Sequence, residues 1–107
     1  MLNLAPELAP ESRDLTPMQK QIVCAIVEAH LPRQKVRVFG SRAGRAAKPF
    51  SDLDLLVVGD ALDDLLRGDL EEAFDESDLP FRVDIVEAAS LSPAFLARIE
   101  PESVALT

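Results

Sequence analysis

The sequence predicts a small α+β fold in which a mixed β-sheet is covered by helices. Its 107 residues and 11.7 kDa correspond to one domain of ordinary size. Apolar residues make up 48% of the chain, which is enough to form a hydrophobic core. Segments of helical and strand periodicity follow one another in the order helix, strand, strand, helix, strand, helix, which predicts a sheet of about three or four strands.

Residues 1–14 are expected to form an arm outside the folded domain. They contain the tetrapeptide LAPE twice in succession, and its prolines oppose a regular helix while favouring extended backbone. We therefore expect a flexible arm over residues 1–14 and a folded domain over residues 15–107.

The first helix is expected to begin at Pro17. Thr16 can cap it, proline is favoured at the first helical position, and Gln19 stands at the capping-box spacing. Pro32 is expected to end it. Apolar residues recur at helical spacing, and the predicted buried face consists of Met18, Ile22, Ala25, Ile26 and Ala29, widened by Val23 and Val27.

Three strands are expected after this helix. The first covers residues 36–40 and ends at a glycine, and the second covers residues 52–58. The third covers residues 81–86, with the sequence FRVDIV. β-Branched and aromatic residues favour strands, and a short apolar run such as residues 55–58 is typical of a strand buried on both faces.

Two further helices complete the predicted order. Between the second and third strands, apolar residues recur at spacings of three and four over residues 62–74, which predicts a helix weakened by Gly68. Ser92 followed by proline predicts the start of a short last helix through Ile99, and Pro101 limits its extension.

The composition excludes several classes of protein. Nineteen acidic residues against eleven basic ones give a net charge of −8, which opposes direct binding to nucleic acid. One cysteine and one histidine cannot form an internal disulfide or a histidine-rich zinc site. The longest apolar run, residues 22–27, is too short to cross a membrane. We therefore expect a cytoplasmic protein with no direct nucleic-acid or membrane partner.

Neither Cys24 nor His30 is assigned to a functional site. His30 stands near the end of the first helix, where a histidine interacts favourably with the helix dipole. Cys24 is expected on the polar side of that helix with Gln21 and Glu28, and without a neighbouring base it is interpreted as an inert thiol.

Charge is distributed unevenly along the chain. Residues 33–48 contain six of the eleven basic residues and no acid, whereas residues 52–87 contain thirteen of the nineteen acids. The acidic face of the helix over residues 62–74 is interpreted as a solvated surface, with a docking surface for a basic protein as the alternative. The acids on the strands call for a different interpretation.

Three aspartates are expected to lie together at one end of the sheet. Asp52 and Asp54 share a face of the second strand, because side chains alternate along a strand. Asp84 can lie beside them if the second and third strands are neighbours. Clustered carboxylates repel one another and call for a cation, and oxygen ligands favour Mg²⁺ over zinc.

A glycine-serine turn precedes these carboxylates. Gly40 and Ser41 end the first strand, where backbone N–H groups and a hydroxyl can contact an anion. Arg42, Arg45 and Lys48 add positive charge nearby. Carboxylates that bind a metal beside a phosphate-binding turn are the two components of phosphoryl or nucleotidyl transfer.

The segment GSRAGRAAKPFSDLDLLV, residues 40–57, resembles the signature of the minimal nucleotidyltransferases of the DNA polymerase β superfamily. That signature has G-S, then S-D-x-D about ten residues later, and a third aspartate on a later strand. The resemblance extends over roughly residues 16–100 and implies the nucleotidyltransferase fold. The chain departs from the family at Gly44-Arg45, where Arg-Gly is common.

The resemblance implies a role for each matching residue. Asp52 and Asp54 would bind the Mg²⁺ of an ATP donor, and Asp84 would join them in binding a second Mg²⁺ that activates the attacking hydroxyl. Gly40 and Ser41, with Arg42, would bind the phosphates. Ser51 is counted with this nucleotide site, where it would shape the turn before Asp52.

The resemblance also implies a partner. Chains of this size and family resemble antitoxins that neutralise an all-helical HEPN ribonuclease toxin by adenylylating a tyrosine hydroxyl. A hetero-oligomer or homo-oligomer is expected, since the chain is too short to carry the acceptor-binding domains of larger family members. Two alternatives remain: a catalytically silent module that masks a partner, and a subunit of a small-molecule nucleotidyltransferase of the antibiotic-modifying kind.

Overall fold

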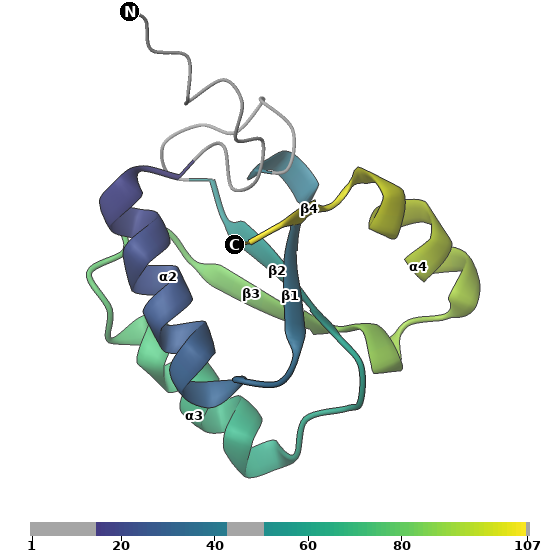
Figure 1. Ribbon diagram of the computed structural model, residues 1–107, viewed down its shortest axis with the longest axis horizontal. Coiled ribbons are helices and arrows are strands. Elements are labelled where there is room, and N and C mark those ends of the chain that lie inside the picture. The colour runs from purple at the N-terminus through teal and green to yellow at the C-terminus, as the bar shows by residue number, and fades with distance from the viewer. Residues whose placement is uncertain (1–14, 43–50, 107) are drawn as a thin grey trace, which may run out of the picture.

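The computed structural model describes residues 15–42 and 51–106. The arm expected over residues 1–14 and most of the segment between the glycine-serine turn and Ser51 lie outside the described residues. Figure 1 shows the arrangement of the elements, which in chain order are α2 (Pro17–His30), β1 (Lys35–Phe39), the 3-10 turn η1 (Gly40–Arg42), β2 (Leu53–Val58), α3 (Asp64–Asp75), β3 (Val83–Glu87), η2 (Ala88–Ser90), α4 (Pro93–Ile99), η3 (Glu100–Glu102) and β4 (Val104–Ala105).

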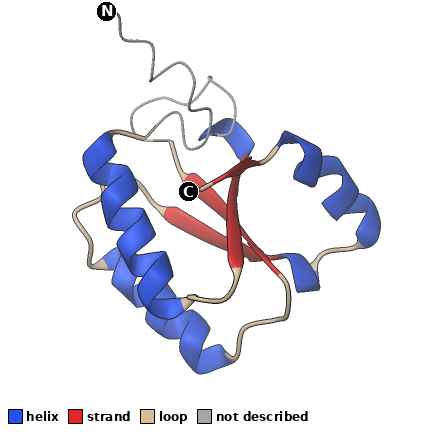
Figure 2. Cartoon of the chain, viewed as in Figure 1, coloured by secondary structure: helices blue, strands red, loops and turns tan. Residues whose placement is uncertain are grey.

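The strands form one mixed sheet in the order β3-β2-β1-β4. β1 pairs antiparallel with both β2 and β4, whereas β2 and β3 are parallel. Figure 2 shows α2 and α3 side by side on one side of the strands and α4 set apart from them. The α+β class and the mixed sheet are confirmed, and the two-residue strand β4 is an addition that the sequence did not predict.

The hydrophobic core lies between this sheet and the pair α2 and α3. Alternate residues of β2, Leu53, Leu55 and Val57, face the helices and are almost completely buried. Leu56 points to the other side of the sheet and is equally buried, so β2 is covered on both faces. A central strand of this kind provides a rigid support for the aspartates at its start.

The buried face of α2 differs from the predicted one. Val23 and Val27 are buried, whereas Met18 is 65% exposed and Ala25 is exposed. The prediction for Cys24 was also wrong, since it packs against the core instead of lying on the polar side. Apolar residues surround much of this helix, so its docking against the sheet and α3, and not its periodicity, decides which of them are buried.

The predicted starts of the first and last helices are confirmed, whereas the middle helix, expected over residues 62–74, begins two residues later as α3 (Asp64–Asp75). Thr16 and Gln19 form the expected capping box: the Gln19 N–H donates to Thr16 Oγ1 at 3.1 Å, and the Thr16 N–H donates to Gln19 Oε1 at 3.0 Å. Ser92 caps α4 by accepting from the Phe95 N–H at 3.1 Å. None of the helices in the described ranges is long and apolar enough to span a bilayer.

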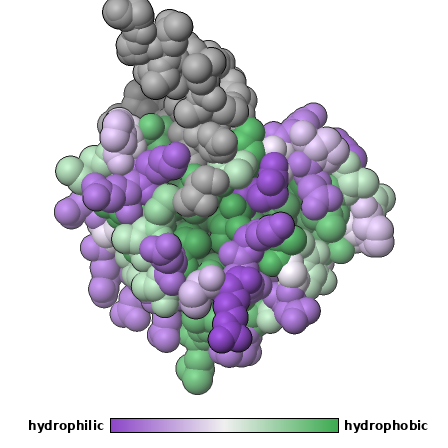
Figure 3. All heavy atoms as spheres, viewed as in Figure 1, coloured by the Kyte–Doolittle hydropathy of each residue, from purple (hydrophilic) through white to green (hydrophobic). Residues whose placement is uncertain are grey.

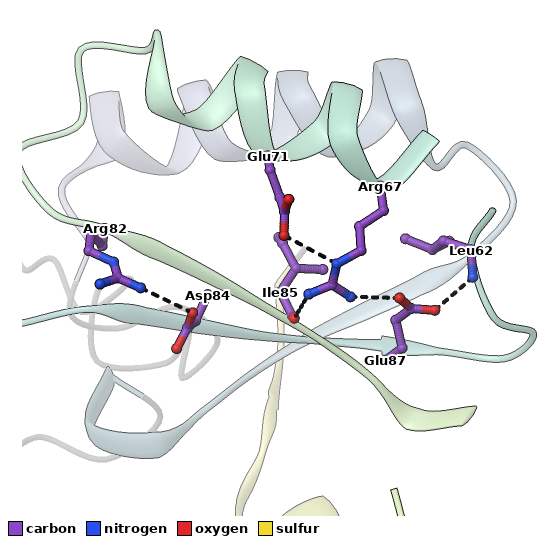
Figure 4. Close-up of polar contacts among 7 residues, drawn as sticks. All are labelled: Leu62, Arg67, Glu71, Arg82, Asp84, Ile85 and Glu87. Carbon is purple, nitrogen blue, oxygen red and sulfur yellow. Dashed lines mark hydrogen bonds and ion pairs between the residues drawn. The ribbon is translucent and has the colours of Figure 1, made fainter. Parts of the chain in front are cut away.

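A buried carboxylate at the end of β3 ties α3 to the sheet (Figure 4). Glu87, 8% exposed, accepts from the Leu62 N–H at 2.7 Å and from Arg67 Nη1 at 2.6 Å. Arg67 Nη2 also donates to the Ile85 carbonyl at 2.8 Å, and Arg67 Nε donates to the exposed Glu71 at 3.1 Å. The Leu62 and Arg67 hydrogen bonds hold the pKa of Glu87 below its ordinary value of 4.5.

Replacing Glu87 with glutamine is expected to lower the free energy of unfolding at pH 7 by about 1.5–3 kcal/mol, the range for hydrogen bonds to charged groups. Because the folded pKa is depressed, this stabilisation is complete above about pH 4.5 and is lost as pH falls through the folded pKa. Urea unfolding at several pH values measures the difference. Glu71→Gln is the control, since an exposed partner of the same arginine contributes at most about 1 kcal/mol; equal losses in the two variants would contradict the prediction.

Candidate active site

The strand register places two of the predicted aspartates side by side. In the parallel pair of β2 and β3, Asp54 is the register partner of Asp84, and both point to the face of the sheet opposite α2 and α3. Asp52 is exposed and lies immediately before β2. The expectation that β2 and β3 are neighbours is therefore confirmed, and this pairing brings together aspartates thirty residues apart in sequence.

The three carboxylates interact electrostatically. Partial burial, together with the negative charges of Asp84 and Asp52, raises the pKa of Asp54 above its ordinary value. Asp84 is half-exposed, and its Oδ1 lies 3.7 Å from Arg82 Nη2 (Figure 4). Because Arg82 is itself largely exposed, this ion pair screens Asp84 only weakly. The arrangement concentrates negative charge at the start of β2 and β3.

Gly40 closes the site on the β1 side. Phe39 at the end of β1 is the register partner of Asp54, so the next residue lies against the Asp54 side chain. A Cβ added at Gly40 would overlap Asp54 Oδ2 and come within 3.3 Å of Asp54 Cγ. The φ of Gly40 is also +75°, a value that other residues rarely adopt. The backbone can therefore approach this carboxylate only with glycine at position 40.

The other residues of the predicted nucleotide site have different surroundings. Arg42 is 2% exposed, and its Nε donates to the Ser51 carbonyl at 3.0 Å. Ser51 is partly buried at the entrance to β2. The backbone of Ser41 belongs to η1, but its side chain, like Arg45, Lys48 and the Gly44-Arg45 departure, lies outside what the structure describes.

The donor set fits a Mg²⁺ ion bound together with a nucleotide. Within the described ranges, no three acidic, histidine or cysteine side chains form a complete metal-binding group. Mg²⁺ needs no such group, since it is usually held by one or two carboxylates, by water and by the phosphates of the substrate. Asp54 and Asp84 supply two neighbouring oxygen donors, and partial burial with mutual repulsion raises the pKa of Asp54, a cost that a bound cation would offset.

A cavity of about 480 Å³ lies elsewhere in the molecule. Residues of α2, β1 and β4 line it, among them Cys24, Leu31 and Lys35. In the space-filling view, apolar side chains gather in the middle of the visible face, between α2 and α4 (Figure 3). None of the three aspartates lines this cavity, and burial raises the pKa of the Cys24 thiol, as suits an unreactive cysteine.

Comparison with known proteins decides the family. Residues 18–106 match the nucleotidyltransferase domain. The chain belongs to the nucleotidyltransferase domain family. It is therefore an enzyme of the nucleotidyltransferase class, and the resemblance seen in residues 40–57 is confirmed. Within the family it is 43% identical over 83 residues to the probable protein adenylyltransferase MntA of Haemophilus influenzae, across 77% of this chain and 73% of that protein.

Solved structures confirm the nucleotidyltransferase fold. A toxin-antitoxin complex crystallised with AMP-PNP matches with a TM-score of 0.67 and 23% identity, over 82% of this chain and 72% of that one. A complex of a tri-AMPylated Shewanella oneidensis HEPN toxin with its MNT antitoxin matches with a TM-score of 0.60 and 21% identity, over 82% of this chain and 68% of that one. Because these identities are low, the matches establish a shared fold and no more.

Phe81 contacts a residue of the predicted site, although its sequence position indicated only a strand residue. The ring centroid of Phe81 is 4.2 Å from Arg42 Cζ, a cation-π contact. The only hint in the sequence is that an aromatic residue stands three positions before the third aspartate. The alternation of the strand predicts only that Phe81 faces the core. The contact depends on a buried arginine from another segment, which no local pattern reveals.

Proposed function

We propose that this nucleotidyltransferase transfers AMP from ATP, with Mg²⁺, to a tyrosine hydroxyl of a HEPN-type toxin, and so acts as an antitoxin in a hetero-oligomer. The observation that carries the proposal is the pairing of Asp54 with Asp84 beside the Gly40 turn. Carboxylates clustered next to a glycine turn provide metal binding and phosphate binding in one place. The single free cysteine is consistent with a reducing, cytoplasmic location.

In this proposal the three carboxylates serve two parts of the reacting system, the nucleotide and the acceptor. Asp52 and Asp54 would hold the metal of the nucleotide, and Asp84 would face the acceptor hydroxyl. When bound, Mg²⁺ neutralises the phosphate charge and lowers the pKa of the acceptor hydroxyl. The acceptor oxygen forms a bond to the α-phosphorus, the bond between the α- and β-phosphates breaks, pyrophosphate leaves and the hydroxyl proton passes to water. Gly40 and Ser41 contact the phosphates through their backbone.

Two observations support a protein as the acceptor. Asp52 and Asp84 are exposed, so a side chain of another protein can reach them. The 43% identical relative bears the name of a protein adenylyltransferase, and the matched structures are toxin-antitoxin complexes. A partner that brings its own tyrosine would supply the acceptor specificity.

The test is incubation of the pure protein with Mg²⁺ and each labelled nucleoside triphosphate, with and without a HEPN-type partner, followed by mass measurement of both proteins. We expect the partner to gain nucleoside monophosphate from ATP in preference to the others, and to lose this gain on Asp52→Ala. Asp69→Ala, which removes an exposed carboxylate of α3, is the matched control and should retain transfer. A partner that is bound and inhibited without any mass gain would instead establish a silent masking module, and transfer to a small molecule alone would establish the antibiotic-modifying class.

A further inference from the structure

Arg42 is an unusual residue because it is a cation buried to 2% exposure in a small protein. Arginine is almost never fully buried unless its guanidinium is paired, because removing its charge from water is costly. Arg42 belongs to η1, directly after the Gly40-Ser41 turn. The contacts of its guanidinium therefore indicate which role Arg42 has.

The guanidinium contacts two segments that each lead to a carboxylate. Its Nε donates to the carbonyl of Ser51 at 3.0 Å, and Ser51 immediately precedes Asp52. Its Cζ lies 4.2 Å from the ring centroid of Phe81, which stands three residues before Asp84. One side chain thus joins the turn after β1, the entrance to β2 and the entrance to β3.

The contacts of Arg42 lie ahead of the paired part of the strands. The register of β2 and β3 begins at Leu53 and Val83, and the first bond between the two entrances is the Leu53 N–H donating to the Arg82 carbonyl at 2.8 Å. Ser51 and Phe81 precede this point. Arg42 therefore contacts residues that strand pairing does not fix, and one of them, Ser51, is next to the exposed Asp52.

We propose that Arg42 is a positioning residue, which holds the entrances of β2 and β3 so that the carboxylates keep their geometry beside the Gly40 turn. This inference rests on the proposed function. It differs from the direct phosphate contact expected from the sequence, because the guanidinium is buried and faces Ser51 and Phe81. A planar guanidinium can donate a hydrogen bond in its plane and place its face on an aromatic ring, which an ammonium cannot do equally well.

The experiment compares Arg42→Gln, Arg42→Lys, Phe81→Leu and the double variant Arg42→Gln/Phe81→Leu with wild type. For a positioning residue, Arg42→Gln should lower kcat by about 10–100-fold, the cost of losing a group that orients metal ligands, while KM for ATP changes by less than about threefold. Arg42→Lys should be as impaired as Arg42→Gln. The effects of Arg42→Gln and Phe81→Leu on kcat should be strongly non-additive, since each breaks the same contact.

A second measurement does not depend on activity. Hydrogen exchange of the Leu53 amide should be faster in Arg42→Gln and in Phe81→Leu, because this amide bonds across the two entrances. Exchange in the core of β2, at Leu55, should stay close to that of wild type and thereby report an intact fold. Arg33→Gln, which removes an exposed cation outside the site, should change neither measurement.

Direct phosphate binding would give the opposite pattern and overturn the proposal. KM for ATP would rise at least about tenfold in Arg42→Gln, Arg42→Lys would restore it because lysine also binds phosphate, and the Leu53 amide would exchange as in wild type. If Arg42→Gln does not fold, transfer kinetics and Leu53 amide exchange are measured in Phe81→Leu instead. A wild-type protein that transfers no nucleotide would refute the proposed function, whereas unchanged Leu53 exchange in both single variants would refute the positioning role.

Discussion

Asp84→Asn is expected to abolish nucleotide transfer while most of the ATP binding is retained. Asp84 is the register partner of Asp54 and faces the side from which the acceptor would approach, so its charge matters most in the transition state. Loss of such an electrostatic contact typically lowers kcat by about 10²–10³-fold. The measurement is single-turnover transfer to the partner protein together with equilibrium binding of AMP-PNP.

Asp78→Asn is the matched control for this variant. Asp78 is an exposed carboxylate in the loop between α3 and β3, and it is not a register partner of β2. Its replacement should leave both transfer and binding unchanged. Transfer by Asp84→Asn at the wild-type rate would remove Asp84 from the site and with it the proposed arrangement of carboxylates.

Gly40→Ala is expected to impair both activity and stability. A residue with a Cβ at φ +75° costs about 1–2 kcal/mol, and the added atom overlaps Asp54 Oδ2. Either the backbone of the turn or the Asp54 carboxylate must move, and we expect transfer to fall by about 10²-fold, as for small misplacements in an active site. Urea unfolding and transfer kinetics measure the two effects.

Gly68→Ala makes the same chemical change at a permissive position. Gly68 lies within α3, and no described atom lies within 4 Å of the Cβ it would gain. In a helix this change should stabilise the protein by about 0.5–1 kcal/mol and leave transfer unchanged. Comparable losses in the two variants would show that the Gly40 turn has no special place beside the carboxylates.

The local elements were predictable where one or two residues determine them. Thr16 with Gln19 predicted the start of α2, and Ser92 predicted the start of α4, because a cap depends on hydrogen bonds within four residues. The start of β3 was placed two residues early, at Phe81. Phe81 has the residue type and the alternation of a strand, but its ring is used against Arg42.

Features that depend on distant segments were not predictable. The buried face of α2, the strand β4 and the bonds of Glu87 to Leu62 and Arg67 all require knowledge of which segments pack together. Arg42 shows this most clearly. As a basic residue beside a glycine-serine turn it predicted phosphate binding, and only the structure shows that its guanidinium also contacts Ser51 and Phe81.

The sequence by itself indicated the family through the motif in residues 40–57, and it predicted the order of the three helices and the first three strands and the positions of the three aspartates, because motifs, alternation and turn chemistry are local features of the chain. Only the tertiary structure decided that β2 and β3 are parallel neighbours in a register that sets Asp54 beside Asp84, and that Gly40 lies against Asp54. The physical reason is that strand pairing and burial are free energies of contact between segments far apart in sequence. A local sequence pattern shows which residues make those contacts, but it does not show the contacts themselves.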